Sequence, residues 1–84
     1  MKVIMFEAEA WCKSCIAMKP FFKQECEKLG VDYEIVDVED DKGVEMSTEY
    51  QIRNVPTLLF FDDNNNVIGR ASGSNAYKDI EKYV

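Results

Sequence analysis

The chain contains no histidine and only three cysteines among its 84 residues. A structural zinc site normally takes four cysteine or histidine ligands, so zinc would need a carboxylate or a second chain to complete its shell. An odd cysteine count also fits poorly with a secreted scaffold in which every cysteine is paired. We therefore expect no metal site in this chain.

Positive charge and long apolar runs are also scarce. The 10 basic residues are outnumbered by 16 acidic ones, and the net charge of −6 has the wrong sign for binding nucleic acid or an anionic membrane. No segment approaches the roughly 18 apolar residues of a membrane-spanning helix, and residues 1–11 do not resemble a secretory leader. We expect a cytoplasmic protein with neither nucleic acid nor membrane as partner; a secreted form without its leader would show the same pattern.

The apolar residues that are present predict one α/β domain over residues 1–84. We expect strands at residues 2–8, 31–38, 56–61 and 67–72, and helices at residues 12–29, 44–50 and from 75 onward. The order is β-α-β-α-β-β-α. An early crossover makes a parallel pair of strands and the late hairpin adds an antiparallel strand. The predicted fold is a four-stranded mixed β-sheet with helices on both faces.

The first and last helices carry specific expectations. Gly30 should end the first helix as a left-handed cap, and Ser74 or Asn75 should cap the last one. Between these helices, the acidic residues 39–43 read as a loop. The expected buried positions are Cys15, Met18, Phe22, Cys26 and Leu29 in the first helix, and Tyr77, Ile80 and Val84 in the last.

Two cysteines three apart, Cys12 and Cys15, lie where the first strand gives way to the first helix. The free N–H groups and the dipole of a helix N-terminus favour an anion, so the pKa of Cys12 should fall below its usual value of about 8.5. Lys13 adds a positive charge that acts in the same direction. Cys15 lies one turn deeper on the apolar stripe and should be less exposed than Cys12.

This asymmetry suits thiol–disulfide exchange. An exposed, ionised Cys12 attacks a substrate disulfide to form a mixed disulfide, and Cys15 then attacks Cys12 and leaves an internal Cys12–Cys15 bridge. The alternative is a static staple, but a bridge across four residues removes little entropy from the unfolded chain. The pattern therefore favours a redox couple.

The sequence also resembles the thioredoxin family over residues 3–84. WCKSC matches the Trp-Cys-x-x-Cys of that family, Pro20 matches its helix-kinking proline, and residues 50–61 (YQIRNVPTLLFF) resemble the stretch that carries its cis-proline. Gly73 matches a glycine of the substrate-facing surface. Two motifs about 40 residues apart are much more specific than CxxC alone.

The resemblance implies a protein-disulfide reductase, an electron carrier in cell redox homeostasis. The implied substrate-binding residues are Trp11, Val55, Pro56 and Gly73. Without the resemblance, Trp11 is equally compatible with anchoring the strand–helix corner. Pro56 is then compatible with a trans proline that opens an ordinary strand. The implied partners are protein disulfides and a flavin-dependent reductase; we expect a monomer and, since the cysteines hold the electrons, no bound cofactor.

Three features depart from the family pattern. Lys13 and Ser14 replace the usual Gly-Pro between the cysteines, and a lower Cys12 pKa predicts a couple less reducing than its relatives. Phe6 stands where the family has a buried acid; its neighbour Glu7 either acts as base for Cys15, with a pKa raised by burial, or points into solvent. Cys26 lies about 16 Å along the helix from Cys15, too far to bridge.

Alternatives remain open at this stage. Cys26 is either a small core residue or a site of intermolecular pairing or oxidation. The whole chain is alternatively a non-catalytic binding module that docks a partner through Trp11, Val55 and Gly73, although such an adaptor would not need a reactive pair. An oxidase or isomerase of the same fold would differ in potential, near about −120 to −180 mV rather than about −270 mV. The absence of a Gly-Gly pair after the proline strand argues against a glutathione site.

Overall fold

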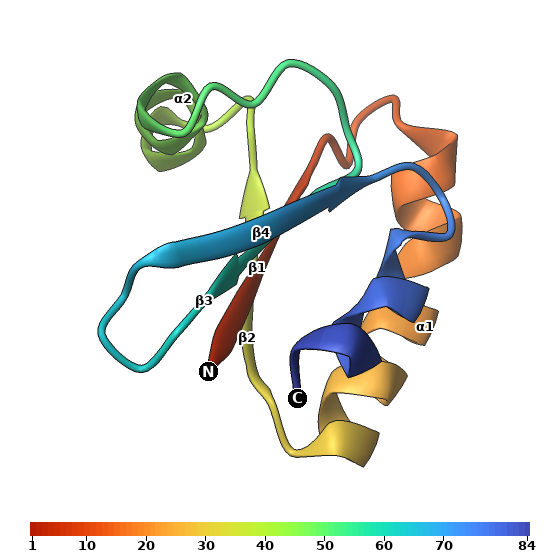
Figure 1. Cartoon of the computed structure of the whole chain (residues 1–84). Helices are drawn as coiled ribbons and strands as arrows, with labels where there is room; N and C mark the ends of the chain where they lie inside the picture. The colour runs from red at the N-terminus through yellow and green to blue at the C-terminus, as the bar shows by residue number, and fades with distance from the viewer.

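The computed structural model describes residues 1–84 and has the predicted order of elements (Figure 1). The elements are β1 (Lys2–Glu7), α1 (Lys13–Leu29), β2 (Asp32–Asp37), α2 (Asp41–Glu49), β3 (Thr57–Phe61), β4 (Val67–Ser72) and the 3₁₀ helix η1 (Ala76–Tyr83). None of the helices is long and apolar enough to cross a membrane.

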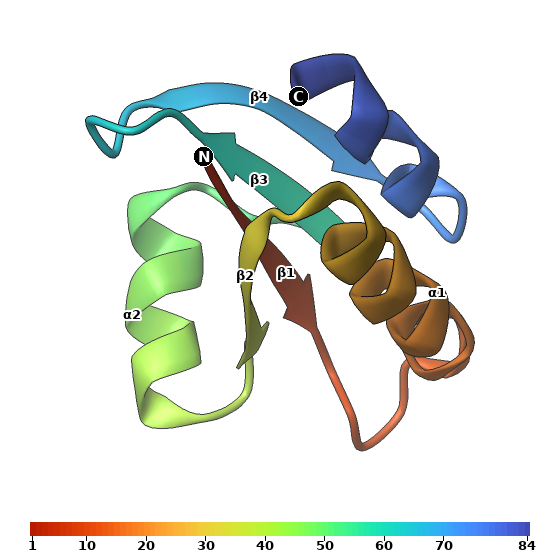
Figure 2. The same ribbon diagram turned by 90° about the horizontal axis from the view of Figure 1, so that it is seen from below.

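The four strands form one mixed sheet in the order β2-β1-β3-β4. The β1 strand pairs in parallel with β2 and antiparallel with β3, and β4 pairs antiparallel with β3. Helices α1 and η1 cover one face of this sheet and α2 covers the other (Figure 2). The predicted mixed sheet with helices on both faces is confirmed.

The central strand β1 is apolar along most of its length because it is covered on both sides. Side chains alternate between the faces of a strand, so Val3 and Met5 join the cluster under α1 and η1, while Ile4 and Phe6 join the cluster under α2. The polar end residue of this strand, Glu7, is buried and lies beside Lys19 of α1.

Helix α1 follows its sequence pattern closely. The residues buried along its inner face are Cys15, Met18, Phe22 and Cys26. Leu29 is half-buried, and Gly30 adopts the left-handed conformation (φ 67°, ψ 32°), donating its N–H to the carbonyls of Cys26 and Glu27. The left-handed cap predicted at Gly30 is confirmed.

One predicted boundary and one predicted cap were wrong. Helix α2 begins at Asp41, so part of the segment expected as a loop is helical. The cause is Asp40, whose carboxylate accepts a hydrogen bond from the N–H of Gly43 at 2.6 Å and caps the first turn. The final helix is 3₁₀ and has no side-chain cap at Asn75.

The inward face of η1 also differs from the α-helical expectation. A 3₁₀ helix repeats every three residues, which places Tyr77, Ile80 and Tyr83 on one side. Tyr77 stacks on Phe21 at 5.6 Å between ring centroids, and Tyr83 stacks on Phe60 at 4.1 Å. Val84, predicted to face inward, is 60% exposed.

Candidate active site

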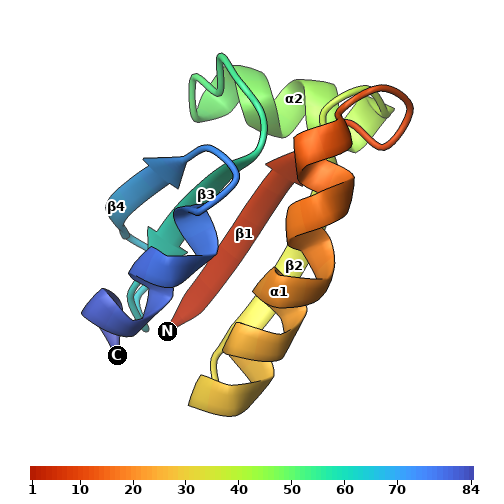
Figure 3. The same cartoon turned by 90° about the vertical axis from the view of Figure 1, so that its right-hand side faces the viewer.

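Cys12 and Cys15 form a disulfide at the start of α1, with their Cα atoms 5.2 Å apart. Cys12 ends the loop from β1 to α1, which Figure 3 shows, and Cys15 lies in the first turn of α1. This loop is closed by the Ala8 carbonyl, which accepts hydrogen bonds from the N–H groups of Trp11 at 3.3 Å and Cys12 at 2.9 Å. The turn therefore delivers Cys12 to the N-cap position of the helix.

The environment of the Cys12 sulfur favours its anionic form. The sulfur accepts a hydrogen bond from the backbone N–H of Cys15 at 3.1 Å, as an N-cap side chain does. The Ser14 hydroxyl lies 3.4 Å from the same sulfur. Lys13, predicted to lower the Cys12 pKa through its charge, is exposed and forms no ion pair, so that role stays a prediction.

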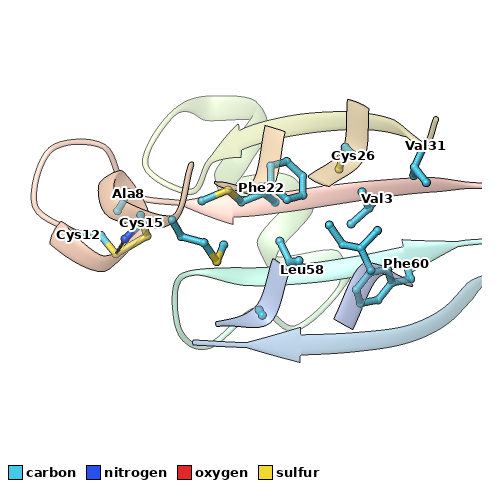
Figure 4. Close-up of a cluster of buried hydrophobic side chains, with 13 residues drawn as sticks. Val3, Ala8, Cys12, Cys15, Phe22, Cys26, Val31, Leu58 and Phe60 are labelled. Carbon is cyan, nitrogen blue, oxygen red and sulfur yellow. Dashed lines mark hydrogen bonds between the residues drawn. A yellow bond between two sulfur atoms is a disulfide. The ribbon is translucent and has the colours of Figure 1, made fainter. Parts of the chain in front are cut away.

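The prediction that Cys12 is exposed is wrong for this disulfide form. Cys12 is only 4% exposed and Cys15 is fully buried. Both sulfurs belong to the core cluster under α1, together with Ala8, and they lie at one end of that cluster (Figure 4). Cys12 is the more accessible of the two, as predicted, but only its edge reaches solvent.

The substrate-binding residues expected from the resemblance come from three separate connections that lie at one end of the sheet (Figure 1). Trp11 is 60% exposed, Val55 is half-buried and Pro56 is buried. The Val55–Pro56 peptide bond is cis. Gly73 (φ 100°) donates its N–H to the Pro56 carbonyl at 3.0 Å, which ties the turn after β4 to the segment before β3.

A surface pocket of about 220 Å³ joins two of these segments. Trp11, the residue before Cys12, forms one part of its wall, and the indole N–H of Trp11 is held by the Glu39 carboxylate at 2.9 Å. The complete lining is Trp11, Val38, Ser47, Ile52, Arg53, Asn54 and Val55. The lining thus combines apolar side chains (Trp11, Val38, Ile52, Val55) with polar ones.

Glu7 is buried, with a residue exposure of 4%, so the alternative in which it points into solvent is wrong. Its Oε1 lies 2.9 Å from Nζ of Lys19 on α1. Sequence reasoning missed Lys19 as well as Glu39. The only local signal for Lys19 was its spacing of four residues from Cys15, which puts both residues on the same side of α1.

Cys26 is free, fully buried and at the far end of the core cluster from the disulfide (Figure 4). Burial raises the pKa of its thiol to about 12, with further contributions from the negative charges of Glu25 and Glu27. A thiol in this state is a core residue rather than a nucleophile. No group of three or more potential ligands comes together to hold a metal ion.

The fold and the site together form a recognisable arrangement. A mixed sheet carries a CxxC disulfide that caps the first helix, faced by a proline loop and a glycine turn, and this arrangement is suited to dithiol–disulfide exchange. The chain belongs to the thioredoxin family: the family model described as Thioredoxin matches residues 1–84.

Individual relatives agree with this assignment. The chain is 36% identical over 62 residues to a thioredoxin of Mycoplasmoides gallisepticum, covering 74% of this chain and 61% of that protein. It is 32% identical over 76 residues to a chicken (Gallus gallus) thioredoxin, and the match covers 90% of this chain and 70% of the chicken protein. The solved structure of thioredoxin 1 from Thermosipho africanus superposes with a TM-score of 0.81 at 25% identity. The superposition covers 99% of this chain and 93% of that one. The chain thus spans less than two thirds of the length of the first of these relatives.

Proposed function

We propose that the chain reduces protein disulfides through the Cys12/Cys15 couple. The observation that carries this proposal is the position of Cys12, whose sulfur caps α1 and accepts a hydrogen bond from the Cys15 N–H at 3.1 Å. Such a cap stabilises a thiolate, which is the attacking species in thiol–disulfide exchange. Cys15 is fully buried and stays out of contact with solvent until the mixed disulfide forms.

The reaction proceeds in two exchanges. The Cys12 thiolate attacks one sulfur of the substrate disulfide, a Cys12–substrate bond forms, and the other substrate sulfur leaves as a thiolate. Cys15 then loses its proton and attacks Cys12, the bond to the substrate breaks, and the second substrate thiolate departs. Two electrons pass to the substrate, and the chain is left as the Cys12–Cys15 disulfide. The buried Glu7 is the proposed acceptor of the Cys15 proton.

The substrate approaches over the end of the sheet where Trp11, Val55, Pro56 and Gly73 meet. An extended peptide there pairs with the Val55 backbone as an added strand, while the exposed Trp11 ring covers its side chains. We further propose that a flavin-dependent reductase restores the dithiol, that the chain acts as a monomer, and that it works in a reducing compartment such as the cytoplasm. The two donors to the Cys12 sulfur support a couple less reducing than its relatives, because they stabilise the thiolate of the reduced form.

A redox titration combined with trapping tests this function. The protein is equilibrated in graded dithiothreitol buffers, and its oxidation state is followed by Trp11 fluorescence and thiol alkylation. A reversible two-electron transition is expected, with a midpoint near about −270 mV for a reductase or about −120 to −180 mV for an oxidase or isomerase.

Two variants then separate catalysis from simple binding. The Cys15→Ser variant should accumulate a mixed disulfide with a reducible protein such as insulin, whereas the Cys12→Ser variant should not. Cys26→Ser, matched in chemistry but outside the site, should behave as the parent. Absence of any reversible transition between Cys12 and Cys15 would leave a non-catalytic binding module as the better explanation.

A further inference from the structure

A cluster of polar side chains lies between the segment before β3 and the end of β4. Thr57, the first residue of β3, is only 1% exposed, so its hydroxyl depends on partners within the protein. This hydroxyl lies 2.7 Å from the backbone carbonyl oxygen of Asn54 and 3.1 Å from the side-chain Oδ1 of the same residue. The Ser72 hydroxyl lies 3.0 Å from the Thr57 oxygen and 3.5 Å from Oδ1 of Asn54. The cluster thus joins the proline segment to the end of β4.

The two hydroxyls determine how the Asn54 side chain is held. Thr57 and Ser72 have one hydroxyl hydrogen each, and Asn54 offers two oxygen acceptors to them. The backbone oxygen of Asn54 can therefore take the Thr57 hydrogen, and Oδ1 can take the Ser72 hydrogen. Because Oδ1 is turned toward the hydroxyls, the nitrogen of the same planar carboxamide is directed away from them. This nitrogen donates no hydrogen bond within the chain, so its N–H groups are free donors.

The free donors lie where a substrate is expected. Asn54 is exposed, and it lines the surface pocket of about 220 Å³ together with Trp11 and Val55. Val55 lies outside the helices and strands, and it takes part in none of the backbone hydrogen bonds of the turns and loops. The N–H and the carbonyl of Val55 are therefore unpaired, directly beside the Asn54 carboxamide.

The backbone on either side of Val55 is already occupied. The carbonyl of Asn54 accepts from the Thr57 hydroxyl, and the carbonyl of Pro56 accepts from the N–H of Gly73 at 3.0 Å. In an antiparallel pair, residues that bond to the neighbouring strand alternate with residues whose backbone groups point the other way. Of these three consecutive residues, Val55 alone has both backbone groups free. A peptide that pairs with Val55 therefore passes beside the Asn54 carboxamide.

We propose that Asn54 is a further substrate-binding residue: its carboxamide N–H groups donate to a main-chain carbonyl oxygen of the substrate segment that pairs with Val55. This inference rests on the proposed function and names what the site binds there, the main chain of an extended peptide. A small disulfide without a peptide bond offers no such oxygen. Thr57 and Ser72 are positioning residues, which hold the carboxamide without touching the substrate.

Two disulfides separate peptide binding from attack by Cys12. The first is a disulfide-linked peptide whose residues around the cysteines are all alanine, so that no side chain there can accept a hydrogen bond. The second is bis(2-hydroxyethyl) disulfide, which is uncharged and has no carbonyl. The reduced full chain is mixed with an excess of each, and the rate is followed by Trp11 fluorescence over a range of concentrations. The half-saturating peptide concentration reports binding; the limiting rate and the rate with the small disulfide report attack by Cys12.

The expected result is a loss of binding for the peptide alone. Asn54→Asp keeps the shape of the side chain and an oxygen for the two hydroxyls, but it has no N–H to donate. Its half-saturating peptide concentration should rise by about two- to tenfold, which is the effect of one hydrogen bond. Its limiting rate and its rate with the small disulfide should equal those of the parent. Asn54→Ala should show the same rise.

Asn64→Asp is the matched control. Asn64 is an exposed asparagine in the turn between β3 and β4, where its backbone N–H, and not its side chain, bonds to Asp62. The substitution adds the same negative charge as Asn54→Asp at the opposite end of β3. It should leave the half-saturating peptide concentration at the parental value, so that a change in the overall charge of the chain is ruled out as the cause.

The outcomes decide the proposal as follows. A parental half-saturating concentration in Asn54→Asp overturns it; if Asn54→Ala alone is impaired, Asn54 merely holds the segment through its oxygen. An equal slowing of Asn54→Asp with both disulfides also overturns it, because the change then lies at Cys12. If Asn54→Asp does not fold, a parental half-saturating concentration in Asn54→Ala is the refuting result. A parent that reduces neither disulfide would instead refute the reductase function.

Discussion

Removal of the Ser14 hydroxyl should make the dithiol couple a stronger reductant. The Ser14 Oγ lies 3.4 Å from the Cys12 sulfur and is one of two donors that reach it, the other being the Cys15 N–H at 3.1 Å. A disulfide sulfur is a weak acceptor, whereas a thiolate is charged, so the hydroxyl stabilises the reduced form more than the oxidised form. Ser14→Ala removes this preference without touching the core, because Ser14 is exposed.

The size of the effect follows from the geometry. A well-formed hydrogen bond to a charged group contributes about 1.5–3 kcal/mol. The contact from Ser14 is long and only partly buried, so we take about 0.5–1 kcal/mol for it. For a two-electron couple about 1.4 kcal/mol corresponds to about 30 mV, so the potential of Ser14→Ala should fall by about 10–20 mV.

The measurement is a dithiothreitol titration at a pH where Cys12 is ionised, followed by Trp11 fluorescence and confirmed by alkylation. Ser74→Ala is a matched control, because Ser74 is an exposed serine outside the helix start and should leave the potential unchanged. An unchanged potential in Ser14→Ala, or a shift toward a less negative value, would show that the hydroxyl does not stabilise the thiolate.

Three further results are expected from the scaffold. Native Cys26 should resist alkylation at pH 8 and react only after unfolding. The pKa of its thiol is 9.0 in the unfolded chain and is raised to about 12 by burial in the folded one. The stability that this difference contributes is therefore complete below pH 9 and is lost as the pH rises to about 12. Asp40→Ala removes the cap on Gly43 N–H and should cost about 1 kcal/mol, seen as a fall of about 4–8 °C in Tm. Gly43→Ala should destabilise the chain by about 1–3 kcal/mol in urea unfolding, because its Cβ would collide with the backbone carbonyl of Asp37; a variant as stable as the parent would contradict that packing.

Local sequence patterns predicted most of the fold. The apolar stripe of α1 follows from a repeat of 3.6 residues, and the strands of the β3–β4 hairpin follow from a repeat of two residues. The left-handed conformation at residue 30 follows from glycine itself. All of these are properties of residues that are neighbours in the chain. The α2 boundary was missed because Asp40 was read as part of an acidic loop rather than as a cap. Val84 was misplaced because an α-helical period was applied to a segment that forms a 3₁₀ helix.

The candidate site, too, was determined partly by the sequence and partly by the tertiary structure. By itself, the sequence determined the CxxC pair, its place at a helix start and the proline segment about 40 residues later, because spacing along the chain decides whether two sulfurs can bridge. Only the tertiary structure decided which groups surround the pair. The burial of Cys12 and the Glu7–Lys19 ion pair arise because β1, its following loop and α1 fold against one another. Such contacts depend on the packing of whole elements, which no local pattern encodes.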